Sequence, residues 1–293
     1  MLTIATAVLS ASLAIAALAF AFALVYWSTR VFYVLLGGLV AVAPLLVADL
    51  DPRWGLGAAM ILAALVTAAL SLLLGWANHE LLVRHGAPQG VHFTCSLALY
   101  YLISELAALR WGSDVRSLAI LPEVRRLAAS TWCQLPATQL VSMGACLALV
   151  GAVALGLRCS GSGVKLRALA DNPAELARSG YNPVRLRALA FVAAGGVAWA
   201  AATAMAMDLA VGTHGGMVAL IPAATATLLT PAGRWRRLLA WSLALGLLRT
   251  AVTFAVSGAW QDPLTLGLLL LGLLGRRQGG RRPGLELAAQ GAG

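Results

Sequence analysis

The chain of 293 residues is 60% hydrophobic and only 11% charged, with a formal net charge of +10. Because soluble domains carry about 25% charged residues, this composition excludes a soluble globular protein and predicts a polytopic membrane protein. The excess of Lys and Arg would suit nucleic acid, but these residues concentrate in a few short loops, as they do in the cytoplasmic loops of membrane proteins. We therefore expect no nucleic acid partner.

The N-terminal segment contains no charged side chain before Arg30. A cleavable signal peptide begins with a basic region, and this segment has none. We therefore interpret it as a retained membrane span whose N-terminus lies outside.

Apolar segments follow one another along the chain, and about 20 such residues are needed to cross a bilayer. We predict an all-α fold, a polytopic transmembrane helical bundle with about eight or nine spans. The candidate spans are residues 5–27, 31–48, 54–76, 91–109, 139–157, 187–208, 213–231, 236–257 and 262–275. The second, seventh and ninth are short or interrupted by Gly and Pro, so we expect one of them to be re-entrant or strongly tilted.

The distribution of charge predicts one orientation, with the N-terminus outside and the C-terminus inside. The inner side then receives most of the basic loops, namely those with Arg30, Arg84, residues 158–187, residues 234–237 and residues 276–282. The outer side receives the acidic turn at Asp49–Arg53, Asp208 and Asp262. The loop 110–138, which contains four arginines, also falls on the outer side and is the exception to this distribution of charge. We treat residues 1–282 as one transmembrane domain and residues 283–293 as a disordered cytoplasmic tail.

The third apolar segment is followed by His79, Glu80 and His85, residue types that can bind metal. The two histidines are six residues apart and do not share a helical face, and we expect this segment to be a loop. The four cysteines are scattered without ligand spacing, so neither a zinc site nor a disulfide framework is predicted.

Two ionisable residues lie deep within predicted spans, where a charge costs about 2.5–3.5 kcal/mol or more. Glu105 either lines a pathway or contacts a partner subunit, or it lies near the outer interface and pairs with Arg110 on the same helix. Arg249 either binds a solute carboxylate bidentately or extends its guanidinium to an interface.

The longest polar segment, residues 158–187, contains two strong helix starts. Asn172 is followed directly by Pro173, and Glu175 lies three residues after Asn172. This is the arrangement of a capping box. Gly180 is suited to end this helix, and Asn182 followed by Pro183 begins the next. A helix of roughly seven residues is too short to be stable alone in water. We therefore expect it to dock on a neighbour and to act as a coupling element towards a soluble partner.

The same segment carries a resemblance to a known family. It resembles the cytoplasmic loop of the LivH-type permeases of branched-chain amino acid ABC transporters. The matching positions are residues 163–172 (GVKLRALADN), Ala177, Gly180, Asn182 and residues 189–191 (LAF). Residues 24–38, 84–90, 109–118 and 247–280 resemble other parts of these permeases less closely. Most of the chain can thus be aligned with the family.

The resemblance implies an ABC importer permease fold and a subunit that is not an enzyme. Such a permease binds no cofactor directly, because ATP is hydrolysed by partner subunits. The implied partners are two cytoplasmic ABC ATPases, a second permease in a homo- or heterodimer, a periplasmic or extracellular solute-binding protein and membrane lipid. The implied location is the bacterial inner membrane, and the implied solutes are branched-chain amino acids or related small amides.

The resemblance also assigns the ATPase-coupling residues. They are Leu166, Arg167, Ala168, Ala170, Asp171, Asn172, Pro173, Glu175, Ala177 and Gly180. An apolar face towards the ATPase is expected from Leu166, Leu169, Ala170, Leu176 and Ala177. Arg167, Arg178 and Arg185 are expected to pair with its acids.

Two stretches depart from the family pattern. Residues 33–37 (YVLLG) replace the usual Asn-Phe-Ala-His-Gly, and residues 229–234 (LTPAGR) replace a Gly-rich stretch. Gly37 is retained, and with Glu105 and Arg249 it forms our candidate set for the substrate pathway. The departures favour a solute other than a leucine-like amino acid, such as urea or a short amide. They also leave open a non-transporting scaffold of the same fold, and a stand-alone secondary transporter is a further alternative.

Overall fold

The computed structural model describes residues 2–113, 118, 124, 131–132, 135–159, 161–208, 212–255 and 258–279. Its first half consists of α1 (Leu2–Thr29), α2 (Leu35–Trp54), α3 (Leu56–Leu70), the π-helix η1 (Ser71–Trp76), α4 (Ala77–Arg84) and α5 (Gln89–Trp111). Its second half consists of α7 (Ala137–Cys159), α8 (Ser162–Asp171), α9 (Pro173–Arg178), α10 (Pro183–Asp208), α11 (Gly216–Leu228), α12 (Trp235–Ala255), the 3-10 turn η3 (Gly258–Trp260) and α13 (Gln261–Gly279). The expected all-α fold is confirmed. Within the described residues, one antiparallel pair of two-residue strands, β1 (Thr131–Trp132) and β2 (Leu135–Pro136), precedes α7.

Each of the nine predicted spans contains a helix, although the predicted bounds extend beyond it in places, as at residues 31–34, 213–215 and 229–231. Six helices in this part of the chain are long and apolar enough to cross a membrane. Helix α11 is shorter, with 13 residues, and at 1.5 Å per residue it covers about 20 Å of a hydrocarbon core about 30 Å thick. The segment 213–231 is therefore the one that fits the expected re-entrant or tilted element.

Helix boundaries differ from the predictions in two places. The turn expected at Asp49–Arg53 is instead the last turn of α2, and the chain reverses at Gly55, whose φ of +75° favours glycine. The loop expected around His79 is wrong as well, because α3, η1 and α4 form one continuous helix up to Arg84. Apolar periodicity fades in the last turns of this helix, and tertiary contacts hold them in helical form.

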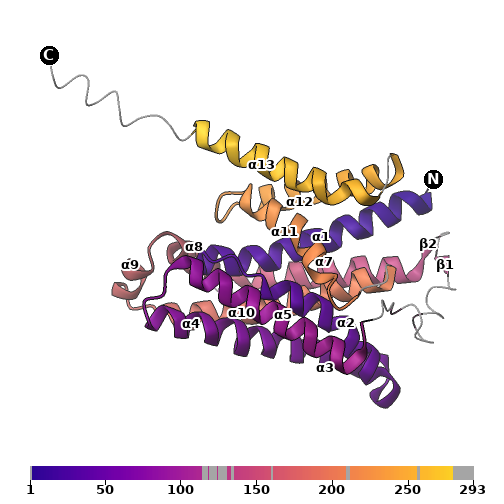
Figure 1. Ribbon diagram of the computed structural model, residues 1–293, viewed down its shortest axis with the longest axis horizontal. Helices are drawn as coiled ribbons and strands as arrows, with labels where there is room; N and C mark the ends of the chain where they lie inside the picture. Colours follow the sequence, from indigo (N-terminus) through magenta and orange to yellow (C-terminus); the bar gives the residue numbers. More distant parts are fainter. Residues whose placement is uncertain are drawn as a thin grey trace.

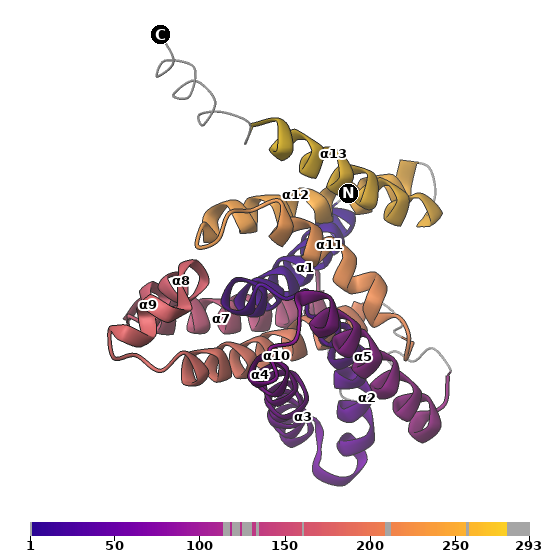
Figure 2. The ribbon, with the colours of Figure 1, turned by 60° about the vertical axis from the view of Figure 1, so that its left-hand side comes forward.

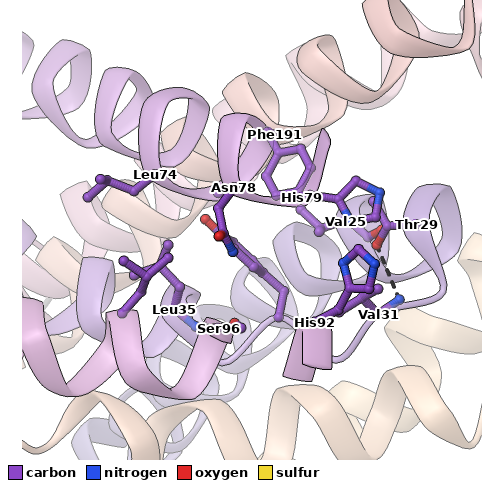
Figure 3. Close-up of a pocket in the computed structure, with 13 residues that line it drawn as sticks. Val25, Thr29, Val31, Leu35, Leu74, Asn78, His79, His92, Ser96 and Phe191 are labelled. Carbon is purple, nitrogen blue, oxygen red and sulfur yellow. Dashed lines mark hydrogen bonds between the residues drawn. The ribbon is translucent and has the colours of Figure 1, made fainter. Parts of the chain in front are cut away.

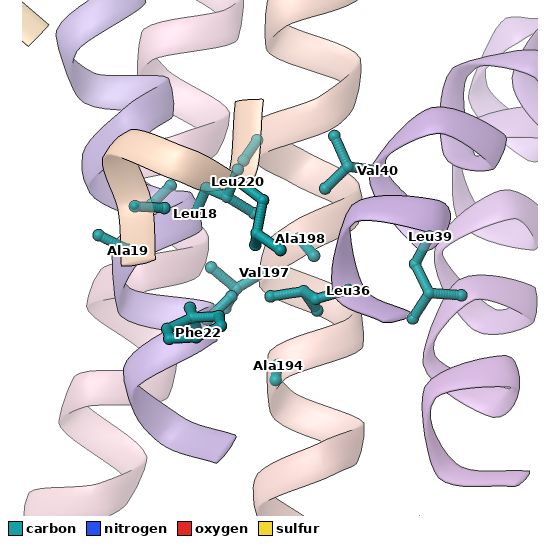
Figure 4. Close-up of a cluster of buried hydrophobic side chains, with 14 of the residues drawn as sticks. Leu18, Ala19, Phe22, Leu36, Leu39, Val40, Ala194, Val197, Ala198 and Leu220 are labelled. Carbon is teal, nitrogen blue, oxygen red and sulfur yellow. The ribbon is translucent and has the colours of Figure 1, made fainter. Parts of the chain in front are cut away.

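Helix α1 lies at the centre of the bundle and packs against α7, α10, α11 and α12. Figures 1 and 2 show α12 and α13 on one side of it and α3, α4 and α5 on the other. Leu18 and Phe22 of α1 meet Leu36 of α2, Val197 of α10 and Leu220 of α11 in a core of fully buried side chains (Figure 4). Small residues on α10 in this core allow its backbone to approach α1 closely.

Helices α2 and α11 approach each other closely at Gly37 and Gly216. A Cβ atom added to Gly216 would overlap the Gly37 carbonyl oxygen, and one added to Gly37 would lie 3.1 Å from the Gly216 oxygen. A side chain larger than hydrogen cannot be accommodated at Gly216 unless the α2 backbone shifts, so the geometry of this crossing depends on that glycine.

The N-terminus and the α8–α9 segment lie at opposite ends of the bundle (Figure 1). The turn between α4 and α5, at residues 85–88, is at the same end as α8 and α9. The loops in which basic residues concentrate at positions 30, 84 and 165–187 are thus gathered at one end.

Candidate functional site: the α8–α9 segment and a polar pocket

The predicted cap at Asn172 is confirmed. Its side-chain oxygen accepts hydrogen bonds from the backbone N–H groups of Ala174 and Glu175, at 3.1 and 3.2 Å. The reciprocal half of a capping box is not made, because the Asn172 N–H donates to the Ala168 carbonyl. The Glu175 carboxylate instead pairs with Arg178 at 3.3 Å. One side chain therefore caps α9, while α8 continues directly into the cap residue.

The end of α9 and the start of α10 also follow the predicted pattern. Gly180 adopts a φ of +82°, the left-handed conformation that terminates helices. Asn182 then accepts hydrogen bonds from the N–H groups of Val184 and Arg185, at 3.0 and 3.3 Å. Two Asn–Pro caps and one glycine thus fix α9 as a short helix with defined ends.

Docking holds this six-residue helix in place. Leu176 is the buried residue of α9 and packs against Leu169 of α8 and Leu186 of α10. Lys165 adds a cation–π contact, with its Nζ 4.7 Å from the centre of the Tyr181 ring. The segment is attached to its own bundle and not free in solvent.

This packing overturns one expectation about the apolar face. Leu169, Ala170 and Leu176 are buried against the protein's own helices, so they are not offered to a partner. Their burial follows from helix length, since so short a helix must use its apolar side chains for docking.

The other assigned residues lie on or near the outer surface of the segment. Leu166 and Ala168 are half-buried, and the exposed residues are Asp171, Asn172, Pro173, Glu175, Ala177 and Gly180. Arg178 and Arg185 are exposed too, whereas the side chain of Arg167 lies outside the described part of the structure. The surface left for a partner is therefore small, polar and centred on α9.

Arg30 connects this segment to the junction between α1 and α2. Its guanidinium donates from Nε and Nη2 to the Ala170 carbonyl, at 3.2 and 2.9 Å, and lies 4.0 Å from Asp171. Its own carbonyl accepts a hydrogen bond from Gln89 at the start of α5. Arg30 has a φ of +60°, which is uncommon for a residue other than glycine. A strained backbone that is held by contacts with α8 and α5 marks a candidate functional position.

A polar pocket opens beside the same junction. It is lined by Val25, Thr29, Val31, Tyr33, Leu35, Leu74, Gly75, Asn78, His79, His92, Ser96, Leu99 and Phe191. Figure 3 shows Asn78 and His79 entering from α4 and His92 and Ser96 from α5. Part of the wall is formed by η1, a π-helical turn of a kind found frequently at functional sites.

The two histidines of the pocket come from neighbouring helices and face each other. Their ring centroids are 5.0 Å apart, and both side chains are buried. Sequence reasoning considered His79 with His85 and missed His92. A signal was available, since His79 lies five residues before the end of α4 and His92 three residues after the start of α5, so both are close to the short turn that joins these helices.

A buried ion pair joins α4 to α10 next to the pocket. Arg187 contacts Glu80 at 3.2 Å, and the side chains are only 13% and 11% exposed. The indole N–H of Trp76 donates to the Val184 carbonyl, at 3.3 Å. These contacts tie the start of α10, directly after α9, to the helix that forms one wall of the pocket.

Among the described residues, no three His, Cys, Asp or Glu side chains come together as a metal site would require.

Residues 2–274 match the model of a protein family described as the permease component of branched-chain amino acid transport systems. The chain belongs to this family. No significant match was found among curated proteins or among solved structures. The match extends from α1 into α13, so the whole helical bundle is that of a multi-pass transport permease.

Glu105 of the permease lies on the outer face of α5. Its side chain is 65% exposed, and its carboxylate is 4.0 Å from the imidazole of His214. Of the two alternatives for Glu105, the pairing with Arg110 is not made, because Arg110 contacts Asp49 of α2 at 3.5 Å. Arg110 therefore pairs with an acid of another helix and not with the nearby Glu105 of its own helix. This acid, Asp49, lies on α2 and not in an outside turn.

Arg249 is enclosed between α12 and α13. Its guanidinium donates to Asp262 at 2.8 Å, to Gln261 at 3.1 Å and to Thr265 at 3.2 Å. Only 11% of the side chain is exposed. Gly37, the third pathway candidate, is buried at the crossing with Gly216. The three candidates therefore lie in three different environments of the permease.

We expect the Arg249→Met variant of the permease to have a free energy of unfolding lower by about 2 kcal/mol, because it loses the hydrogen bonds that a charged group makes to Asp262, Gln261 and Thr265. Thermal unfolding of the detergent-purified protein measures the effect. Arg236→Met removes an exposed guanidinium from the same helix and serves as the control. Equal unfolding temperatures for the two variants would show that the network does not hold α13.

Proposed function

We propose that this permease is the transmembrane subunit of an ATP-driven ABC importer in a bacterial inner membrane, with its N-terminus outside and its C-terminus inside. Its solutes are branched-chain amino acids or related small amide or amino-acid solutes. Cytoplasmic ATPases hydrolyse the ATP, a second permease completes the pathway, and an extracellular or periplasmic binding protein delivers the solute. The observation that carries the proposal is α9, a capped six-residue helix that is docked through Leu176 and exposed on its opposite face.

The contacts of α8 and α9 support a mechanical role. A helix with fixed ends moves as a unit when a partner pushes it, and its motion reaches whatever its ends are attached to. One attachment is Arg30, which holds the last turn of α8 to the α1–α2 junction. The other is α10, which starts at Pro183 and is tied to α4 through the pair between Arg187 and Glu80.

In this mechanism, closure of the ATPase dimer displaces α8 and α9 and so changes the packing of α1, α2, α4 and α10. A solute biases such a change only through contacts that differ between the two states of the transporter. The proposal is supported by the attachments of α8 and α9, since Arg30 and α4 adjoin the walls of the polar pocket.

The test is affinity purification of the tagged permease from its native membrane, with and without Ala177→Trp. Ala177 is exposed on α9, so a bulky side chain there blocks a docked partner without disturbing the core. Ala152→Trp, at an exposed position of α7, is the matched control. We expect an ATPase and a second permease to copurify with the wild type and with Ala152→Trp, and the ATPase to be lost with Ala177→Trp.

Two outcomes contradict the proposal. Recovery of no ATPase from gently solubilised wild-type membranes would favour a stand-alone transporter or a scaffold. Unchanged recovery with Ala177→Trp would show that the partner docks elsewhere on the permease.

A further inference from the structure

Three arginines cluster at the start of α12. Arg234, Arg236 and Arg237 lie at the end of the stretch 229–234, which departs from the family pattern, or directly after it, and all three are exposed. None of the ion pairs formed among the described residues includes them. The cluster therefore brings together three positive charges that no acid of the described chain neutralises.

The position of these arginines in the helix increases their need for an anion. The first turn of α12 contains no acidic side chain, and the start of a helix carries a partial positive charge from its unpaired N–H groups. Arginine is unfavourable at such a position unless an anion offsets the repulsion. Phosphate suits both features, because it binds guanidinium groups bidentately and accepts hydrogen bonds at helix N-termini.

The ring of Trp235 fixes this helix start against α1. Its centroid lies 4.7 Å from that of Phe20 and 4.5 Å from that of Trp27. Trp27 is only 5% exposed, and its indole N–H makes no hydrogen bond within the described part of the chain. Buried polar groups are almost always satisfied, so this N–H requires a partner from outside the described chain.

The space beside the Trp27 ring limits what that partner is. Trp27, Gly233 and Trp235 line a cavity of about 10 Å³, which admits about one oxygen atom and not a whole phosphate group. Gly233 and Trp235 flank Arg234 in the chain. A phosphate at the helix start therefore remains on the surface with the arginines and directs one oxygen towards the indole.

The face of α12 that carries the arginines continues as an apolar stripe. Trp241 lies one turn beyond Arg237, and Leu247 and Leu248 lie about two turns further along the same face. These three apolar side chains are exposed, and in a membrane span such side chains contact acyl chains. A ligand on this face meets positive charge first and hydrocarbon next, which matches the phosphate and the acyl chains of one phospholipid.

The level of the cluster favours lipid over a soluble partner. Trp235 packs beside Phe20 and Trp27, which lie before the end of α1 at Thr29. Helix α8 contacts Arg30, beyond that end, and α9 projects further from the bundle (Figure 1). The start of α12 is thus level with the last turns of α1 and set back from the surface that α9 offers.

We propose that the start of α12 binds the phosphate of an anionic phospholipid in the leaflet at the α9 end of the bundle. Arg234, Arg236 and Arg237 bind the phosphate oxygens, one of which accepts the Trp27 N–H, and the acyl chains lie along the stripe that begins at Trp241. This inference goes beyond the proposed function, because it requires neither an ATPase nor a transported solute.

The experiment is a lipid titration of the detergent-purified permease, followed by native mass spectrometry. The added probes are phosphatidylglycerol, zwitterionic phosphatidylcholine and glycerol phosphate, which lacks acyl chains. We expect phosphatidylglycerol to bind the wild type about tenfold or more tightly than phosphatidylcholine does, since each basic residue near an anionic lipid adds to its affinity. Glycerol phosphate should bind far more weakly, because the apolar stripe then contributes nothing.

The cluster variant replaces the three arginines together and is expected to lose the preference for phosphatidylglycerol; it combines Arg234→Gln, Arg236→Gln and Arg237→Gln. A charge-matched control removes three exposed arginines from scattered positions and is expected to keep the preference; it combines Arg53→Gln, Arg84→Gln and Arg185→Gln. Thermal unfolding in the same detergent shows that both proteins are folded.

A variant without any change of charge tests the helix start itself. Trp27→Phe keeps an aromatic ring and removes the N–H, so phosphatidylglycerol should bind about fivefold more weakly, as the loss of one hydrogen bond to a charged group predicts. Trp199→Phe removes another indole N–H that lacks a described partner, on α10, and should bind as the wild type does.

Four results overturn the inference. The first is equal affinity of the wild type for the two phospholipids, and the second is an equal loss of preference in the scattered control. The third is binding of glycerol phosphate as tight as that of phosphatidylglycerol, which would assign the cluster to a free phosphate. The fourth is loss of the copurifying ATPase from a cluster variant that still prefers phosphatidylglycerol, which would assign the arginines to acids of that protein.

Discussion

Glu80→Leu is expected to lower the free energy of unfolding by about 3–5 kcal/mol, the cost of removing one partner of a buried ion pair. The remaining guanidinium of Arg187 would be only 13% exposed, with no acid in contact. Its Nε atom already lacks a hydrogen-bond partner among the described residues. The variant should therefore yield little folded permease, or a protein that unfolds at a much lower temperature in the same detergent.

The double variant Glu80→Leu with Arg187→Met separates charge from packing. Because both charges are then absent, most of the lost stability should return. Glu175→Leu removes one partner of an exposed pair on α9 and is expected to change stability little. If the double variant were as unstable as Glu80→Leu alone, the pair would act through side-chain volume and not through charge.

Gly216→Val is expected to destabilise the permease by about 3 kcal/mol or more, at or above the upper end of the cost of overpacking. The added side chain meets the backbone of α2 at Gly37, and backbone cannot move aside as a flexible side chain can. Helices α2 and α11 would have to separate, which also loosens the core around Leu36 and Leu220. Thermal unfolding and the yield of monodisperse protein measure the effect.

Gly151→Val on α7 is the matched control, since a Cβ atom at this position meets no described atom within 4 Å. Valine has a higher helix propensity than glycine in both helices, so a loss of stability confined to Gly216→Val reports the contact between α2 and α11. Equal stability of the two variants would mean that the crossing relaxes at little cost.

Local chemistry made the α8–α9 segment predictable from sequence. An Asn–Pro cap and a terminating glycine act within a few residues of the chain, so Asn172, Gly180 and Asn182 could be assigned without knowledge of the fold. The positions of the spans were predictable for a similar reason, because length and hydrophobicity are local properties. The burial of Leu176 could not be predicted from the sequence, because it depends on where α8 and α10 lie.

The features that could not be predicted depend on contacts between residues that are distant in the chain. Arg249 pairs with residues of the following helix, and Glu80 pairs with a residue more than a hundred positions away. No local pattern indicates which partner a charge will find, so sequence left these residues with several interpretations. The pocket was missed because its polar side chains come from four segments, and each of them alone resembles an ordinary polar residue near the end of a span.

The π-helical turn η1 determines where α4 points. A π-turn closes its hydrogen bonds over one residue more than an α-turn does, so η1 acts as an added residue within an otherwise α-helical span. Each residue of an α-helix turns the chain by about 100°. Loss of one residue from Ser71–Trp76 would therefore rotate the helical phase of everything after it and carry Asn78 and His79 off the pocket wall, with every lining side chain still present in the sequence. The length of this turn, as much as the identity of the side chains, decides whether this permease has a polar pocket.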